Sequence, residues 1–217
     1  MKKADDSDSL PSDPSSRIWV HGITDQQAQA FCDAVMDARD RDSDSPILVF
    51  INSDGGDLDA LLSMLSVMDC VSNPFITICT GRACSAGAVL LSNGDGRFVG
   101  PHARVMIHEA SVGTGGHITD FQATAEEFKK VNDLMMSILA RNTGKSIEKL
   151  RRLLAQRRDF YFSAKEAVDF GLADGVGIPC LKTPSPDLAF PQPINSRRTW
   201  EFHYRPNKPP KTEKKKK

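Results

Sequence analysis

The sequence predicts a layered α/β fold in which the strands pair mainly in parallel. Strand and helix signals alternate between residues 17 and 179, which is the order that parallel sheets require. Residues 47–51 form a continuous apolar run, which is typical of a strand covered on both faces. No internal repeat of solenoid length appears. We therefore expect one domain over residues 17–179, with a tail at each end.

The first two units each combine a strand with an amphipathic helix. The apolar residues 18–20 end at Gly22, and apolar residues then recur at helical spacing between positions 28 and 36. The strand 47–51 is broken by residues 54–56, Asp-Gly-Gly, before a second helical pattern over residues 58–68.

The third and fourth strands are expected at residues 75–79 and 104–108. Between them, GRACSAGA at 81–88 reads as a loop of small residues that permits close backbone approach, and the apolar residues 89–91 follow it. After the fourth strand, VGTGGHITD at 112–120 is too rich in glycine for an ordinary strand, and we expect it to be mobile.

Helical patterns fill the rest of the domain. The longest covers residues 121–140 and ends at Asn142-Thr143-Gly144; its apolar stripe consists of Phe128, Val131, Met135 and Ile138, widened by Leu134 and Leu139. Another helix is outlined by leucines at 150, 153 and 154. Ser163 and Glu166 form a capping box that opens a short helix ending at Gly171.

Composition excludes several classes of protein. The chain has 217 residues, 40% hydrophobic and 26% charged, and no apolar run approaches the roughly 20 residues of a membrane span. Residues 1–16 lack the apolar stretch of a secretory signal. Five scattered cysteines form neither a disulfide framework nor a CxxC metal site, so we expect reduced and mostly buried thiols in a cytoplasmic protein.

The net charge of zero conceals an uneven distribution. Residues 195–217 hold nine Lys or Arg against Glu201 and Glu213, a sum of +7; residues 1–16 sum to −2, so 17–194 carries −5. We expect a disordered segment at 1–16 and an extended basic tail at 180–217 with no helical or strand period. The tail is either a solvated, solubilising segment or an electrostatic attachment to nucleic acid or an acidic partner. Of these two partners nucleic acid is the less expected, because no aromatic-interleaved basic surface accompanies the tail.

Ser85 is a candidate nucleophile. It stands among small residues where a helix-like stretch begins, at a turn where backbone N–H groups lack intrahelical partners. Gly55 and Gly56 follow a buried strand, so their N–H groups could face a cleft and hold an oxyanion. Each feature alone also fits a tightly packed turn.

A nucleophilic serine needs a base and a group that orients the base. Of five histidines, His108 ends an apolar strand, although a histidine there is commonly structural. Asp159 stands in aromatic surroundings after Arg157 and Arg158, where it could equally form a surface ion pair.

Together these features resemble ClpP, the proteolytic subunit of the Clp proteases. The matching motifs are ILVFINSDGG (47–56), TICTGRACSAGAVLL (77–91), RVMIHEA (104–110) and RRDFYFSAKEAVDFGLADGV (157–176). They occur in the family's order at similar spacing; residues 47–176 are similar throughout, and 17–46 share the strand and helix pattern. The resemblance implies a stacked β-sheet superhelix, like that of ClpP and crotonase, with flanking helices and a protruding handle helix.

The resemblance also implies roles for the site residues. Ser85 would be the nucleophile, His108 the general base and Asp159 its orienting partner. The N–H groups of Gly56 and Ala86 would form the oxyanion hole, and Gly55 would shape the turn. The implied reaction is acyl-enzyme peptide hydrolysis, with no metal or cofactor. Asp54, Cys84 and Ala86 depart from the family's usual proline, alanine and methionine; we expect Cys84 to be a packing residue.

The family implies an assembly as well. Residues 112–140 resemble the handle, which aligns substrate and interlocks two heptameric rings into a tetradecamer around a closed chamber, although a plain core stripe fits the helix almost as well. A separate ring ATPase would unfold and feed polypeptide substrates, since this chain has no GxxxxGK[ST] phosphate loop. The short acidic N-terminus and the basic tail point to a divergent member.

Three alternatives stay open. One is a phage head-maturation type of protease that acts without an ATPase. Another is a ring subunit without activity, which the intact set of Ser85, His108 and Asp159 argues against. The third is an enoyl-CoA hydratase-like enzyme of shared architecture, which would give this set of three side chains no purpose.

Overall fold

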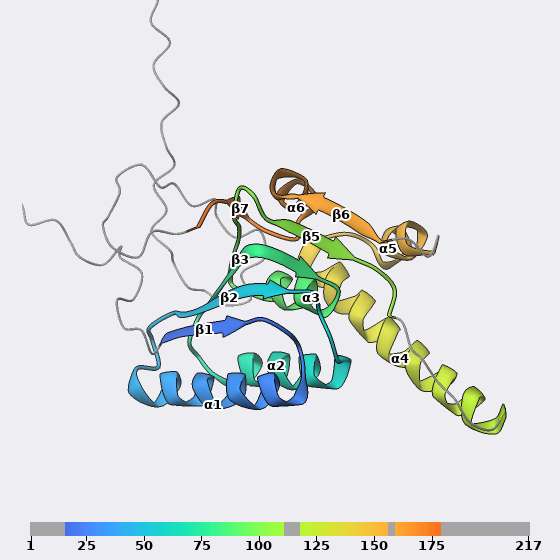
Figure 1. Cartoon of the computed structure of the whole chain (residues 1–217), viewed down its shortest axis with the longest axis horizontal. Helices are drawn as coiled ribbons and strands as arrows, with labels where there is room; N and C mark the ends of the chain where they lie inside the picture. Colours follow the sequence, from blue (N-terminus) through green and yellow to red (C-terminus); the bar gives the residue numbers. More distant parts are fainter. Residues whose placement is uncertain (1–15, 111–117, 156–158, 179–217) are drawn as a thin grey trace, which may run out of the picture.

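The computed structural model of the chain describes residues 16–110, 118–155 and 159–178, the first six residues of the second range by their backbone alone (Figure 1). The described residues form seven strands and six helices. The strands are β1 (Arg17–Val20), β2 (Ile47–Ser53), β3 (Phe75–Cys84), β4 (Gly96–Val99), β5 (Arg104–Ile107), β6 (Phe160–Ser163) and β7 (Gly175–Val176). The helices are α1 (Asp25–Arg41), α2 (Leu58–Cys70), α3 (Ala86–Ser92), α4 (Ile118–Thr143), α5 (Ile147–Leu154) and α6 (Ala164–Phe170).

The strands form one sheet that is mostly parallel. Its main path is β1-β2-β3-β4-β7, with every neighbour parallel. β5 pairs in parallel with the last residues of β3, and β6 pairs antiparallel with β5. The predicted mixed α/β fold with a parallel sheet is therefore confirmed, with β6 as the antiparallel exception.

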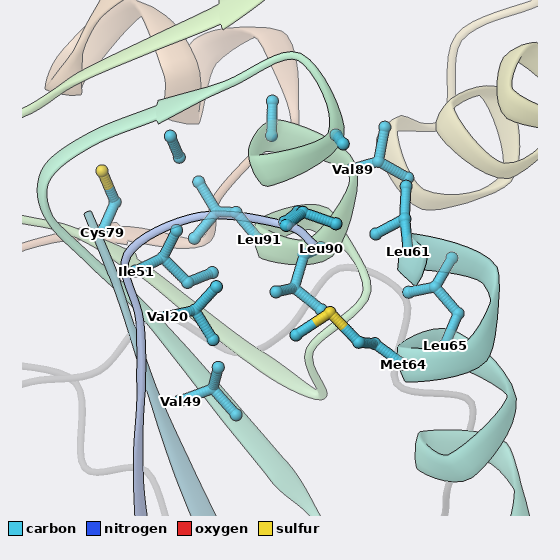
Figure 2. Packing of buried hydrophobic residues seen from close by; sticks show 14 of the residues in the cluster. Val20, Val49, Ile51, Leu61, Met64, Leu65, Cys79, Val89, Leu90 and Leu91 are labelled. Carbon is cyan, nitrogen blue, oxygen red and sulfur yellow. The ribbon is translucent and has the colours of Figure 1, made fainter. Parts of the chain in front are cut away.

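The main core lies between the sheet and the helices. Figure 2 shows Val20, Val49 and Ile51 of β1 and β2 directed toward side chains of α2 and α3, among them Met64 and Leu90. All five of these side chains are fully buried. Burial of one such aliphatic side chain contributes roughly 1.5–3 kcal/mol, so this layer provides much of the stabilisation of the fold.

Polar side chains cap the helices. The side chain of Thr24 accepts the N–H of Gln27 at α1, and that of Asp57 accepts the N–H of Ala60 at α2. The predicted capping box at α6 is confirmed: Ser163 and Glu166 each accept a backbone N–H of the other. Gly171 ends this helix in the left-handed conformation, with φ 94°.

Three predicted boundaries are wrong. β3 continues through residues 80–84 to Cys84 and α3 begins at Ala86, so the expected loop at 81–88 shrinks to Ser85 alone. The long helix begins at Ile118 rather than 121, because three residues of the glycine-rich segment are helical. It ends at Thr143 rather than 140, just before Gly144, whose φ of 68° ends a helix readily. The remainder of the glycine-rich segment, 112–117, lies outside the described residues, as do the tails 1–15 and 179–217.

The apolar stripe of α4 divides into two parts. Near its C-terminal end, Met135 and Ile138 are buried in the main core. Phe128 and Val131 are only half-buried, and Leu134 is 44% exposed. Figure 1 shows the N-terminal part of α4 extending away from the sheet. The core interpretation of this stripe therefore holds for its C-terminal part.

A buried ion pair connects β4 to the ends of α4 and α6. Arg97 of β4 donates from Nε to Asp174 at 3.0 Å, and a second contact joins Nη2 to the other carboxylate oxygen at 2.5 Å. The Nη1 of Arg97 donates to the carbonyl oxygens of Asn142 in α4 and Gly171 at the end of α6. Every contact is buried, so the pair helps fix where these helices end against the sheet.

The described cysteines are all free thiols. Cys79 and Cys84 are buried as expected, but Cys32 is only partly buried and Cys70 is exposed. Cys70 is the last residue of α2, where the helix leaves the core. None of the described helices is both long and apolar enough to cross a bilayer.

Candidate active site

Ser85 occupies the sharp junction between β3 and α3. Its φ of 54° is positive, and no other non-glycine residue in the described part of the chain has a positive φ. Its backbone N–H donates to the carbonyl of Met106 in β5 at 2.8 Å, and its own carbonyl accepts the N–H groups of Ala88 and Val89 in α3. Strand and helix thus hold this serine in a strained conformation, a feature that clusters at functional sites.

The sheet brings His108 to Ser85. β5 pairs with the end of β3 so that Met106 lies opposite Cys84, and His108 follows β5 at once. The His108 Nε2 lies 2.7 Å from the Ser85 Oγ, within hydrogen-bonding distance. A base placed in this way can accept the hydroxyl proton of the serine.

Asp159 reaches His108 through a different pairing. β6 runs antiparallel to β5 with Phe160 opposite Ile107, so the residue before β6 lies beside the residue after β5. Asp159 Oδ1 lies 3.5 Å from His108 Nδ1, on the ring edge opposite Ser85. The two side chains are 50% and 27% exposed. The structure therefore brings the three predicted residues into one row, with Asp159 in the longest and most solvated contact.

Gly55 lies directly beside the serine, and Gly56 continues the same turn. Gly55 accepts the N–H of Ile23, and Asp57 donates to the carbonyl of the same residue. Ile23 and Gly56 form an isolated parallel bridge, so these hydrogen bonds hold Gly56 against Ile23. A Cβ on Gly55 would lie 2.8 Å from the Cys84 carbonyl oxygen and from the Ser85 Cβ, so the turn lies directly against the serine.

Ala86 supplies the second candidate donor. It is the first residue of α3, where N–H groups have no partner within the helix. Its nitrogen would lie 3.2 Å from a Cβ on Gly55, so the glycine turn and the helix start flank Ser85 closely. Both glycines have positive φ, 103° for Gly55 and 148° for Gly56, and a side chain at either would be strained.

Comparison with known families agrees with this arrangement. The sequence model of the family described as Clp protease matches residues 15–179. The chain belongs to the Clp protease family. The family is one of peptidases, generally of the serine type, and the mixed α/β structure with a parallel sheet is consistent with a ClpP-like fold.

Among the residues in which this chain departs from the family, Cys84 directly precedes the serine. Its side chain is only 5% exposed. Burial raises the pKa of the Cys84 thiol, and the negative charge of Asp54 adds to that shift. The raised pKa keeps the Cys84 thiol protonated beside Ser85. Since the thiolate is the reactive form of cysteine, Cys84 is packed there in its unreactive form.

Sequence analysis missed two polar features of this ClpP-like site. Ser53 is fully buried at the end of β2, where its Oγ accepts the N–H of Gly55 at 3.0 Å. Asp54 forms a 2.7 Å ion pair with Arg82 of β3, in which the Asp54 side chain is 71% exposed and that of Arg82 43%. The signal for Ser53 is a hydroxyl in an otherwise apolar run; the ion pair joins residues 28 positions apart and has no local signal.

No metal site accompanies these residues in the described ranges. No three side chains from His, Cys, Asp and Glu gather there in a group that could hold an ion.

Proposed function

We propose that the chain is a serine endopeptidase with Ser85 as nucleophile, His108 as general base and Asp159 as the group that orients His108. The 2.7 Å contact between Ser85 Oγ and His108 Nε2 carries this proposal. Membership of the Clp protease family and the strained backbone of Ser85 support it.

The reaction follows from the order of the contacts. As Ser85 Oγ attacks the scissile carbonyl, its proton passes to His108 Nε2, and Asp159 stabilises the imidazolium through Nδ1. The N–H groups of Gly56 and Ala86 hold the oxyanion of the tetrahedral intermediate. His108 then protonates the leaving amine, and water releases the acyl group by the same steps in reverse.

We also propose that the enzyme works as a ring assembly in the cytoplasm, on polypeptides delivered by a ring ATPase. The N-terminal part of α4, where Phe128 and Val131 are only partly buried, supports the use of this helix as a handle between stacked heptameric rings. Its apolar side chains are more exposed than a helix used only within one chain requires. The stacked β-sheet superhelix of the family belongs to this proposal as well.

An active-site-directed fluorophosphonate tests the catalytic assignment. The reagent phosphonylates a serine only where a base and an oxyanion hole activate it. We expect one label per chain in the wild type, on Ser85 by peptide mass mapping, and none in Ser85→Ala. Ser66→Ala removes an exposed hydroxyl from α2 and should label like the wild type.

Casein or an unfolded polypeptide serves as the parallel substrate. Labelling together with peptide products, both lost in Ser85→Ala, supports the endopeptidase. An assembled protein that neither labels nor cleaves would identify a ring subunit without activity and overturn the proposal. Cleavage of unfolded polypeptide without any ATPase would favour the alternative that resembles phage maturation proteases.

A further inference from the structure

The second face of the sheet carries an apolar surface separate from the main core. Five side chains form it, and we call them the outer cluster: Leu48, Phe50, Ile76, Ile78 and Phe98. The strand register places them side by side on β2, β3 and β4. Trp19 of β1 continues the row, stacked on Phe50 with ring centroids 4.5 Å apart.

The outer cluster is buried, although no described helix packs on it. Its members are 0–7% exposed, and Leu48 and Ile78 are fully buried. The buried side chains of all six helices belong to the main core on the opposite face, where Figure 1 shows α1 and α2. Central side chains of an open sheet face remain in contact with water, so something else covers this face.

Only one stretch of the remaining chain has the composition to cover it. Residues 1–15 contain two large apolar side chains, Met1 and Leu10; residues 111–117 contain one, Val112; and residues 156–158 contain none. Residues 179–217 contain seven from position 181 onward: Leu181, Leu188, Phe190, Ile194, Trp200, Phe202 and Tyr204. The last three occupy alternate positions, so a short extended stretch would present all three rings on one side.

The C-terminal tail also starts beside the outer cluster. β7 pairs with β4, placing Gly175 beside Phe98 of the outer cluster. The N–H of Gly177 donates to the carbonyl of Val99, which holds the chain against β4 to the end of the described range. From Ile178 to Trp200 there are 22 residues, a reach of about 70 Å when extended, whereas β7 and β1 are about 19 Å apart across four strand spacings. The tail can therefore cross the whole face.

We propose that the apolar part of the C-terminal tail, residues 188–204, docks on the outer cluster of its own chain. The basic residues beyond it, 208–217, stay in solvent. The expected solvated tail thus divides into an apolar docking segment and a charged end. The docking does not depend on the catalytic proposal, because the outer cluster and the Ser85 site use different residues.

Photo-crosslinking of the full chain tests which segment covers the outer cluster. Trp19 is 51% exposed at the rim of the outer cluster, so Trp19→p-benzoylphenylalanine places a reactive ketone there. Irradiation of an equal mixture of isotopically light and heavy chains distinguishes crosslinks within a chain from crosslinks between chains. We expect crosslinks to peptides from residues 188–204 within a chain. Crosslinks to another copy, to another protein or only outside this segment would overturn the proposal, as would their absence.

A matched pair of tail variants provides a second readout. Trp200→Ser, Phe202→Ser and Tyr204→Ser combined should expose the outer cluster, raise the fluorescence of a hydrophobic dye several-fold and remove the crosslinks from residues 200–204. Lys214→Ser, Lys215→Ser and Lys216→Ser combined change the charged end by the same number of residues and should alter neither signal. Equal dye binding in both variants would contradict docking.

Discussion

Asp159 makes the longest and most solvated contact of the candidate triad, so its contribution to catalysis is the one that most needs a test. Its carboxylate is half-exposed, and Oδ1 lies 3.5 Å from His108 Nδ1, whereas Ser85 Oγ lies 2.7 Å from His108 Nε2. A neutral amide at position 159 keeps the size of the side chain but cannot stabilise the imidazolium and permits the wrong tautomer of His108. We expect Asp159→Asn to lower kcat by at least about 100-fold, measured with a fluorogenic peptide, without changing assembly.

Asp169→Asn provides the control for Asp159. Asp169 is an exposed acid of α6 that pairs with Lys165 rather than with the candidate site. Its amide variant should retain the turnover of the wild type. If Asp159→Asn did the same, the orienting role assigned to Asp159 would be wrong, and His108 would need another partner.

Residue-scale chemistry was predictable where it coincided with a motif. Ser85, His108 and Gly55 stand in three of the segments that resemble the family, and the structure places all three together. Ser53 was not predictable, because its role arises from a hydrogen bond to Gly55 that only the folded turn creates. The same holds for the ion pair of Asp54 and Arg82, which joins the turn after β2 to β3.

Elements were predictable when they were long or capped. β2 is a continuous apolar run, and α6 has both a capping box and a terminal glycine, so local sequence alone specified them. β4, β6 and β7 were missed because they have two to four residues and depend on pairing with distant strands. Ser85 was expected within a loop, since nothing local shows that β3 and α3 meet at a single residue.

The ion pair between Arg97 and Asp174 links β4 to the ends of two helices. Both side chains are at most 3% exposed, and they join β4 to the ends of α4 and α6. Removing one partner leaves a buried charge without compensation. We expect Asp174→Ala to lower the free energy of unfolding by about 3–5 kcal/mol, measured by urea denaturation.

The solvated pair of Lys165 and Asp169 is the matched control for this measurement. Asp169→Ala breaks a contact of similar length at the protein surface, where water replaces the lost partner. Its urea midpoint should equal that of the wild type. Equal midpoints for Asp174→Ala and Asp169→Ala would show that the buried pair does not anchor these elements.

At the scale of the whole molecule, α4 is the element that bears most directly on the proposed assembly. Its C-terminal part belongs to the main core, while its N-terminal part extends from the body with apolar side chains half-exposed. A second copy packed along the helix would bury those side chains. The arrangement therefore supports the proposal that the assembly uses this helix as a contact.

Leu134→Glu tests that contact without disturbing the core. Leu134 is 44% exposed, so a carboxylate there stays hydrated in the single chain but would lose its water between subunits. We expect native mass spectrometry to show large ring assemblies for the wild type and at least about a tenfold loss of stacked forms for the variant. Met36→Glu, on α1 with 40% exposure, is the matched control and should assemble normally. A monomeric wild type would overturn the ring proposal; unchanged stacking in Leu134→Glu would place the ring contact elsewhere.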